Sequence, residues 1–302
     1  LMISRLLFKI IVSINIIIGF AGCILFEEED DSDKSIIASG DFQYDVYSFE
    51  KNYKLPGRLE EISGLAYWKE NILLCVEDEK GYLYLYDHEK EEIIQEIKFG
   101  KKGDYEGVTQ SEDIAYVIRS TGKLFYFKIE DEPDVTKIDL PFSSSNDLEG
   151  ITKGHKKDEF YIACKQNPEI LGNGIKGRAV YSYNVKKDKV KTKPYIHLTT
   201  EPFVEEIKKA GLNPSRHMPF NPSGIAVHPH TKDVFLISSV GRLLLVMDKA
   251  GSIVSMAPLK RSLFRQPEGI CFDSEGNMFI SSEGRGKKGY ILKFVPTRID
   301  QE

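Results

Sequence analysis

The sequence contains few of the residue patterns that mark common enzyme and zinc sites. Its 302 residues include only six histidines and four cysteines. No histidine pair has metalloprotease spacing, no cysteine pair has zinc-ribbon spacing, and no serine lies in a nucleophile elbow. Two stretches, 172–177 and 284–289, have the glycine spacing of a dinucleotide-binding loop. Each leads into a strand-like run rather than a helix, so both are interpreted as hairpin loops.

An excess of basic residues is also missing, which argues against nucleic acid as a partner. The net charge is −5, and removal of residues 1–22, which contain Arg5 and Lys9 but no acidic residue, would bring it to −7. No basic stripe interrupts the sequence. With 41% hydrophobic and 29% charged residues, the composition is that of a soluble globular protein with a sizeable core.

The amino-terminal segment is typical of an export signal. Arg5 and Lys9 precede an apolar run and a short stretch of small residues that ends at Cys23. This ending resembles a bacterial lipobox, which implies a signal peptide over 1–22 and a lipid on the Cys23 thiol. An uncleaved membrane anchor over 6–26 is the alternative. Either interpretation predicts that residues 27–302 lie outside the cytoplasm, in the cell envelope, with the membrane face left open.

A block of like charge follows Cys23. Six of the seven residues from Glu27 to Asp33 are acidic, and such a block cannot collapse onto itself. We therefore expect a disordered tether over 23–40. Acidic runs in this place resemble the export tags of some surface lipoproteins, and a simple spacer explains the run equally well.

Five copies of one motif indicate the fold. A serine or glutamate precedes a glycine and an aliphatic residue, and each copy opens an apolar run. The five glycines are Gly64, Gly107, Gly150, Gly224 and Gly269. Their separations are 43, 43, 74 and 45 residues, and a period of about 40 to 45 with strand-like content is typical of four-stranded propeller blades. We predict an all-β, five-bladed propeller over 41–302.

The long third interval and the ring closure complete this picture. The extra length, about 166–221, contains apolar residues at helical spacing over 202–210, which predicts a short helix in an insertion. That helix would form a lid or cover an open edge. The segment 42–49 alternates like an outer strand and is expected to complete the last blade.

The residues before the glycines should meet at the propeller axis. The positions are Ser63, Glu106, Glu149, Ser223 and Glu268. Three carboxylates in one concave site repel one another unless a cation or basic side chains neutralise them. All candidate ligands are oxygen donors, which favours Ca²⁺ over zinc. The glutamates are therefore candidate calcium ligands.

The second strand of each blade returns to the same rim. These strands end at Glu77, Arg119, Lys165, Ser238 and Glu283, 12 to 15 residues beyond the motif glycines. Glu77, Arg119, Lys165 and Glu283 are predicted to line the mouth with Ser63 and Ser223. Arg119 and Lys165 would either neutralise the glutamates in a metal-free network or contact an anionic ligand beside a metal.

The remaining cysteines and two histidines receive structural interpretations. Cys75, Cys164 and Cys271 lie in apolar strand patterns and are expected to be buried free thiols. His217, in the insertion, is interpreted as an exposed loop residue, with general-base chemistry at the mouth as the alternative. His228, beside Pro229 at a turn, is expected to be structural.

The motifs resemble one known family. The stretches 61–66, 220–229 and 266–270 are similar to the SdiA-regulated (YjiK-like) family, and the likeness extends over about 55–295. The resemblance implies a five-bladed propeller related to NHL-repeat proteins, often membrane-associated, with a calcium site and no established activity. By motif, the implied calcium ligands are Glu106, Glu149 and Glu268. Asp104, Asp147 and Glu61 are nearby acids that could substitute.

Two functions are compatible with these observations. The first is a lipid-anchored, calcium-binding interaction module that acts as a monomer and presents its rim to a protein, peptide or glycan. The second is a calcium-dependent hydrolase of the lactonase or phosphoesterase type, with its site at the axial mouth. Whether the chain is an enzyme is left open, and a purely structural role is the third possibility.

Overall fold

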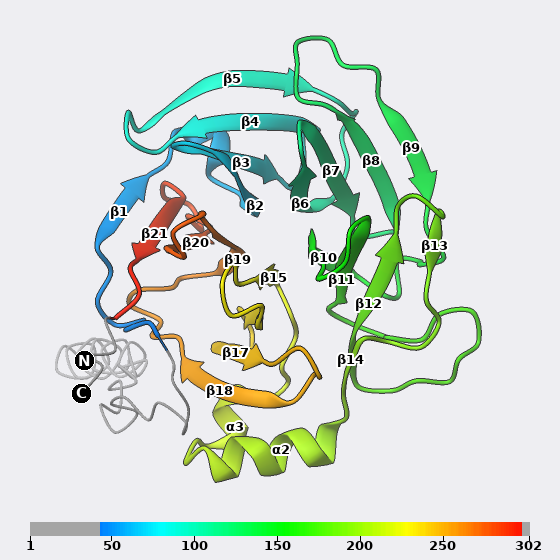
Figure 1. The fold of residues 1–302 in the computed structure, drawn as a ribbon. Helices are drawn as coiled ribbons and strands as arrows, with labels where there is room; N and C mark the ends of the chain where they lie inside the picture. Colours follow the sequence, from blue (N-terminus) through cyan, green and yellow to red (C-terminus); the bar gives the residue numbers. More distant parts are fainter. Residues whose placement is uncertain (1–42, 298–302) are drawn as a thin grey trace, which may run out of the picture. The chain divides into compact units, whose positions relative to one another are not determined.

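Five antiparallel sheets surround one axis in the computed structural model, which describes residues 43–297 (Figure 1). Each sheet is built outwards from an inner strand, and in the first four blades the strands follow one another in sequence order. Short polar turns connect them, as expected for strands whose apolar residues face the neighbouring blades. The predicted five-bladed propeller with four-stranded antiparallel blades is confirmed.

The blades differ mainly in their outer strands. The first blade consists of β2 (Ile62–Lys69), β3 (Ile72–Glu77), β4 (Tyr82–Asp87) and β5 (Glu92–Lys98). The second consists of β6 (Tyr105–Ser111), β7 (Ile114–Arg119), β8 (Lys123–Lys128) and β9 (Thr136–Asp139). The third consists of β10 (Leu148–Lys153), β11 (Glu159–Cys164), β12 (Arg178–Asn184), β13 (Lys189–Val190) and β14 (Ile196–Leu198). Both β13 and β14 pair with β12, so the outer edge of this blade is divided.

The fourth and fifth blades complete the ring. The fourth consists of β15 (Gly224–Val227), β16 (Val234–Ser238), β17 (Leu243–Met247) and β18 (Ile253–Pro258). The fifth consists of β19 (Pro267–Phe272), β20 (Met278–Ser282), β21 (Tyr290–Phe294) and the amino-terminal strand β1 (Lys51–Lys54). β1 pairs antiparallel with β21. The last blade therefore takes its outer strand from the start of the described chain, which fastens the ring.

The closing strand is not the one expected from the sequence. Residues 43–49 of the predicted strand form no strand, 46–48 make a turn and a bend, and the pairing belongs to the next segment. Tyr44 is buried among residues of the fourth and fifth blades, and its hydroxyl lies 2.8 Å from Nε2 of His228. Burial of this aromatic side chain takes the segment away from the sheet edge. The alternation of apolar residues over 42–49 therefore reflects packing between the fourth and fifth blades, not strand pairing.

The motif glycines lie where neighbouring inner strands approach most closely. A Cβ on Gly107 would stand 2.9 Å from the backbone nitrogen of Ile151, and one on Gly269 would stand 2.6 Å from Cβ of Leu65. These distances are too short for any side chain. The second contact joins the fifth blade to the first, so the same requirement extends around the closed ring.

The hydrophobic core is divided into five layers between adjacent blades. Each of the five buried clusters combines residues of two neighbouring sheets. The layer between the third and fourth blades also contains Phe203 and Ile207 from α2 (Thr200–Lys209). Removal of this apolar surface from water is the main contribution that holds the blades together.

The predicted helix is present and covers an edge. α2 and the short α3 (Pro214–His217) follow β14, and Figure 1 places α2 at the periphery of the wheel rather than over its centre. Part of the expected insertion 166–221 belongs to the blade itself, because β12, β13 and β14 lie within it. The added length thus consists of the β11–β12 loop and the segment from α2 to β15. A further short helix, η2 (Gly57–Leu59), follows β1.

Several smaller expectations are also resolved. Cys75, Cys164 and Cys271 are buried and unbridged, as predicted. The stretches 172–177 and 284–289 are loops between strands. Within the described range, no helix combines the length and apolarity needed to cross a bilayer. The expected signal segment 1–22, the lipidation site Cys23 and the tether 23–40 lie outside the described residues.

Candidate functional site

The starts of the five inner strands surround one small axial cavity of about 10 Å³. Glu106, Glu149 and Glu268 all line it, together with Ser63 and the motif glycines. Each carboxylate is placed there because its glycine must lie against the next inner strand, which fixes the direction of the preceding side chain. The structure therefore brings together, at the axis, the three glutamates that the repeats singled out.

Burial makes these carboxylates hard to ionise. Burial, followed by the charges of Glu149 and Asp104, raises the pKa of Glu106 to about 10. Burial and the charge of Glu149 hold the pKa of Glu268 well above its ordinary value. Because desolvation and like charge act in the same direction, the ring must retain protons or acquire a cation at neutral pH.

Glu149 differs from the other two because it has a basic partner. Nζ of Lys165 lies 2.6 Å from Oε1 of Glu149, and the carboxylate is 4% exposed. Burial raises the pKa of Glu149, but Lys165 opposes that rise, and the result is about 7. One positive charge therefore faces three glutamates.

Arg119 does not provide a second neutralising charge. Its guanidinium lies over the ring of Tyr105, with Cζ 5.6 Å from the ring centroid. Its Nε is buried and has no hydrogen-bond partner among the described residues. Of the two cations expected to pair with the glutamates, the structure joins only Lys165 to the ring.

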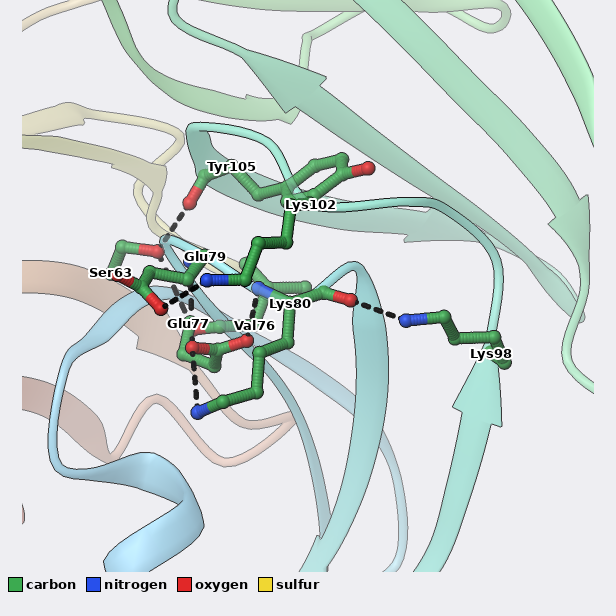
Figure 2. Close-up of polar contacts among 8 residues, drawn as sticks. All are labelled: Ser63, Val76, Glu77, Glu79, Lys80, Lys98, Lys102 and Tyr105. Carbon is green, nitrogen blue, oxygen red and sulfur yellow. Dashed lines mark hydrogen bonds and ion pairs between the residues drawn. The ribbon is translucent and has the colours of Figure 1, made fainter.

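The two serines of the ring connect neighbouring blades. Oγ of Ser63 donates a hydrogen bond of 2.5 Å to the carbonyl of Tyr105, as Figure 2 shows. Oγ of Ser223 does the same to the carbonyl of Pro267, at 2.7 Å. Both acceptors immediately precede a ring glutamate. The serines thus fix the strands that carry Glu106 and Glu268, a role that the sequence did not reveal.

Glu77 is buried beside the mouth and supports a turn. Its Oε1 accepts a hydrogen bond of 2.5 Å from the backbone nitrogen of Lys80, and its Oε2 lies 3.5 Å from Nζ of the same lysine (Figure 2). Ser238 has a comparable role, because its Oγ accepts hydrogen bonds from the backbone nitrogens of Asn221 and Gly241. Both residues hold connections at the rim.

A second group of acids lies next to Glu77. Three carboxylate oxygens lie within 4.8 Å of one another, one each from Glu61, Glu77 and Asp78. Burial and the neighbouring acids Glu61 and Glu77 raise the pKa of Asp78 to about 6. Burial and Asp78 raise the pKa of Glu283 to about 7. Asp78 was missed by the sequence analysis, although it directly follows the second strand of its blade.

The two histidines are both structural in their surroundings. His217 is buried, not exposed as expected, and its Nδ1 lies 2.9 Å from the carbonyl oxygen of Gly241. Its position at the end of α3, packed against the β16–β17 connection, accounts for the burial. It does not line the axial cavity. His228 is buried at its turn and accepts hydrogen bonds from backbone nitrogens, which agrees with the structural interpretation.

Comparisons with known proteins identify relatives in family and in fold. The family model described as SdiA-regulated matches residues 41–285. A comparison with curated proteins found no match. Among solved structures, Myxococcus xanthus glutaminyl cyclase is similar with a TM-score of 0.56 and 11% identity, over 84% of this chain and 97% of that one. Luciferin-regenerating enzyme is similar with a TM-score of 0.50 and 9% identity, over 83% and 96%. At these identities the structural likeness concerns the fold alone.

Proposed function

Because the chain belongs to the SdiA-regulated family, we propose that it is a calcium-binding β-propeller that acts as an interaction module outside the cytoplasm, held to a membrane by a lipid on Cys23. In this proposal Glu106, Glu149 and Glu268 provide carboxylate ligands for Ca²⁺. The rim around them presents binding surface to a protein, peptide or glycan.

The observation that carries the calcium proposal is the charge balance of the axial cavity. Three glutamates line it, and Lys165 is the one basic residue that forms an ion pair with them among the described residues. The raised pKa values of Glu106 and Glu268 reflect burial and neighbouring carboxylates, which Lys165 offsets only in part at Glu268. A divalent cation would provide the missing positive charge and would stabilise the closed ring from its centre.

The size and chemistry of the cavity agree with an ion. Its volume of about 10 Å³ corresponds to a single water-sized sphere. The donors are carboxylate oxygens, which suit hard cations such as Ca²⁺, whereas zinc favours His and Cys ligands. An organic substrate does not fit between the glutamates, which supports a stabilising metal over a substrate-binding pocket at this point of the axis.

Metal analysis combined with thermal unfolding tests the calcium proposal. The purified chain should contain about one equivalent of calcium, and EGTA should lower its thermal midpoint until calcium is restored. Magnesium at the same concentration serves as the control, because its smaller ion requires stricter octahedral geometry. A midpoint that is indifferent to both EGTA and calcium would instead establish a salt-bridged, metal-free mouth.

One observation favours the hydrolase alternative enough to test it. The pKa values of Glu149 and Glu283 are raised to about 7, mainly by burial, and a group of this pKa can act as a general base near neutral pH. A hydrolase should cleave aryl esters, lactones or phosphodiesters in the presence of calcium and lose this activity in Glu149→Gln. An absence of turnover across that panel supports the interaction module.

A further inference from the structure

A cleft lies away from the axis, at the fifth blade. Its volume is about 420 Å³, within the range of about 300–1,000 Å³ typical of small-molecule sites. It lies between the paired strands β1 and β21, the chain that precedes β19, and the β20–β21 connection. We call it the basic cleft, after the four cationic residues that line it: Lys54, Arg265, Lys287 and Lys288.

These four cations have no acidic partners. None of them forms an ion pair with any described residue, and no acidic side chain lines the basic cleft. An uncompensated group of positive charges in a concave site attracts an anion.

Arg265 is the cation best prepared for a specific contact. It is half-buried, and its Cζ lies 5.5 Å from the centroid of the Tyr290 ring. The Tyr290 hydroxyl holds this ring in place, because it donates to the carbonyl of Leu263 and accepts from the backbone nitrogen of Arg265. The guanidinium itself donates no hydrogen bond to a described residue. A planar fork held on an aromatic face is suited to bidentate binding of a phosphate or carboxylate.

The remaining surface of the basic cleft is mostly apolar. Apart from Asn52 and Ser262, it consists of Phe49, Leu263, Tyr290 and Leu292. Leu292 and Tyr290 are buried and Leu263 is half-buried, whereas Phe49 is 36% exposed, which is high for a large hydrophobic side chain. An exposed aromatic residue beside a cationic group offers a stacking surface for an apolar part of the same ligand.

We propose that the basic cleft binds a small organic anion in which a phosphate or carboxylate is joined to an aromatic or similarly apolar group. Arg265 binds the anionic group, the three lysines add attraction, and Phe49 and Tyr290 contact the apolar part. The site is separate from the axial glutamates, so the inference does not depend on calcium. Two connections form the basic cleft: the chain that precedes β19 and the loop between β20 and β21. Both lie on the face of the propeller where β19 begins, which is also the face that carries Glu268.

Titration calorimetry with phenylphosphonate tests this inference, because the probe combines both features and resists hydrolysis. Methylphosphonate lacks the ring and benzyl alcohol lacks the charge. We expect saturable binding of phenylphosphonate, with affinity at least about tenfold above that of either control. The titration is repeated in EGTA. Binding that vanishes with EGTA would assign the anion to the axial metal and overturn the proposal, as would equal binding of all three probes or none.

Variants of exposed and half-buried residues locate the binding. The double variant Lys287→Gln/Lys288→Gln should weaken phenylphosphonate about threefold to tenfold, and Arg265→Gln should weaken it by more than tenfold. Lys186→Gln/Lys187→Gln, at an exposed turn of the third blade, removes the same charge elsewhere and should have no effect. If this control weakens binding equally, the attraction is unspecific and the site is refuted.

Phe49→Ser separates the aromatic contact from the charge. We expect it to weaken phenylphosphonate while it leaves methylphosphonate unchanged, because only the first probe has a ring to stack. Phe49 is already partly exposed, so the substitution should not lower the thermal midpoint. An unchanged affinity for phenylphosphonate would show that the apolar wall does not contact the ligand.

Discussion

Nζ of Lys165 lies 2.6 Å from Oε1 of Glu149, at the centre of a ring that contains two further glutamates. Lys165 belongs to the third blade, like Glu149, and the other two carboxylates come from the second and fifth blades. This ion pair therefore neutralises one blade's carboxylate and leaves those of Glu106 and Glu268 to a proton or a metal.

Lys165→Met should destabilise the calcium-free protein, because it leaves Glu149 buried without its partner. We expect a loss of about 2 kcal/mol in unfolding free energy at pH 8. Added calcium should largely restore stability and should bind more tightly than to the unmodified protein, since a competing positive charge is gone. Chemical denaturation with EGTA or calcium measures both effects. A loss that calcium does not restore would favour the metal-free network.

Glu268→Gln should have opposite effects on stability and on calcium binding. The amide cannot ionise and replaces a buried carboxyl group whose pKa is well above its ordinary value, so the cost of burying an ionisable group is removed and the calcium-free variant should be more stable by about 1 kcal/mol. Calcium affinity should fall at least about tenfold, because one carboxylate ligand is lost. The control is Glu201→Gln, an exposed helix residue. Unchanged calcium binding in Glu268→Gln would remove this residue from the site.

Gly107→Ala should weaken the ring through the backbone contact between the second and third blades. The added Cβ would stand 2.9 Å from the backbone nitrogen of Ile151, and backbone atoms cannot move aside as a flexible side chain can. We expect a loss of about 1–3 kcal/mol. Gly57→Ala is the matched control, because no atom lies within 4 Å of its Cβ position. Equal midpoints for both variants would contradict the close-packing explanation.

His228 should make folding sensitive to acid. Burial, then the charge of His230, lowers its pKa to about 4, below the value of about 6.5 expected in the unfolded chain. The unfolded state therefore gains a proton first as the pH falls, and the contribution of neutral His228 to stability is lost between about pH 6.5 and 4. The difference should reach about 3 kcal/mol. In His228→Gln this part of the pH dependence should disappear, and parallel curves for the two proteins would refute the assignment.

Cys23→Ser should release the protein from membranes if the amino-terminal segment directs lipidation. The full chain, expressed in a bacterial host and labelled with palmitate, is expected to carry the label and to sediment with membranes. The serine variant should lose the label, because the hydroxyl does not replace the thiol that receives the lipid. Cys75→Ser is the control, since that thiol is buried in the first blade. Retained label in Cys23→Ser would contradict the lipoprotein prediction.

The sequence was informative where spacing alone determines position. Gly64 and its four equivalents predicted the number of blades and placed Glu106, Glu149 and Glu268 at the same point of each repeat. Closure was harder to predict, because the alternation of 42–49 describes any chain with one buried face. Only the folded ring shows that Tyr44 packs between blades while β1 pairs with β21.

Side-chain partners were also beyond reach. Arg119 and Lys165 follow equivalent strands, yet Arg119 stacks on Tyr105 and Lys165 reaches Glu149. Each outcome depends on which neighbour the local packing offers, not on position along the repeat. The burial of His217 and the group formed by Asp78 with Glu61 and Glu77 depend on loops that meet only in three dimensions.

By itself, the sequence determined a wheel of five sheets and the carboxylates at its hub, because a repeated glycine imposes the same close approach at every blade. The tertiary structure alone decided how those charges are balanced and where the basic cleft forms. Ion pairs and clefts arise between residues distant along the chain, such as Lys54 and Arg265, whose meeting no local pattern records.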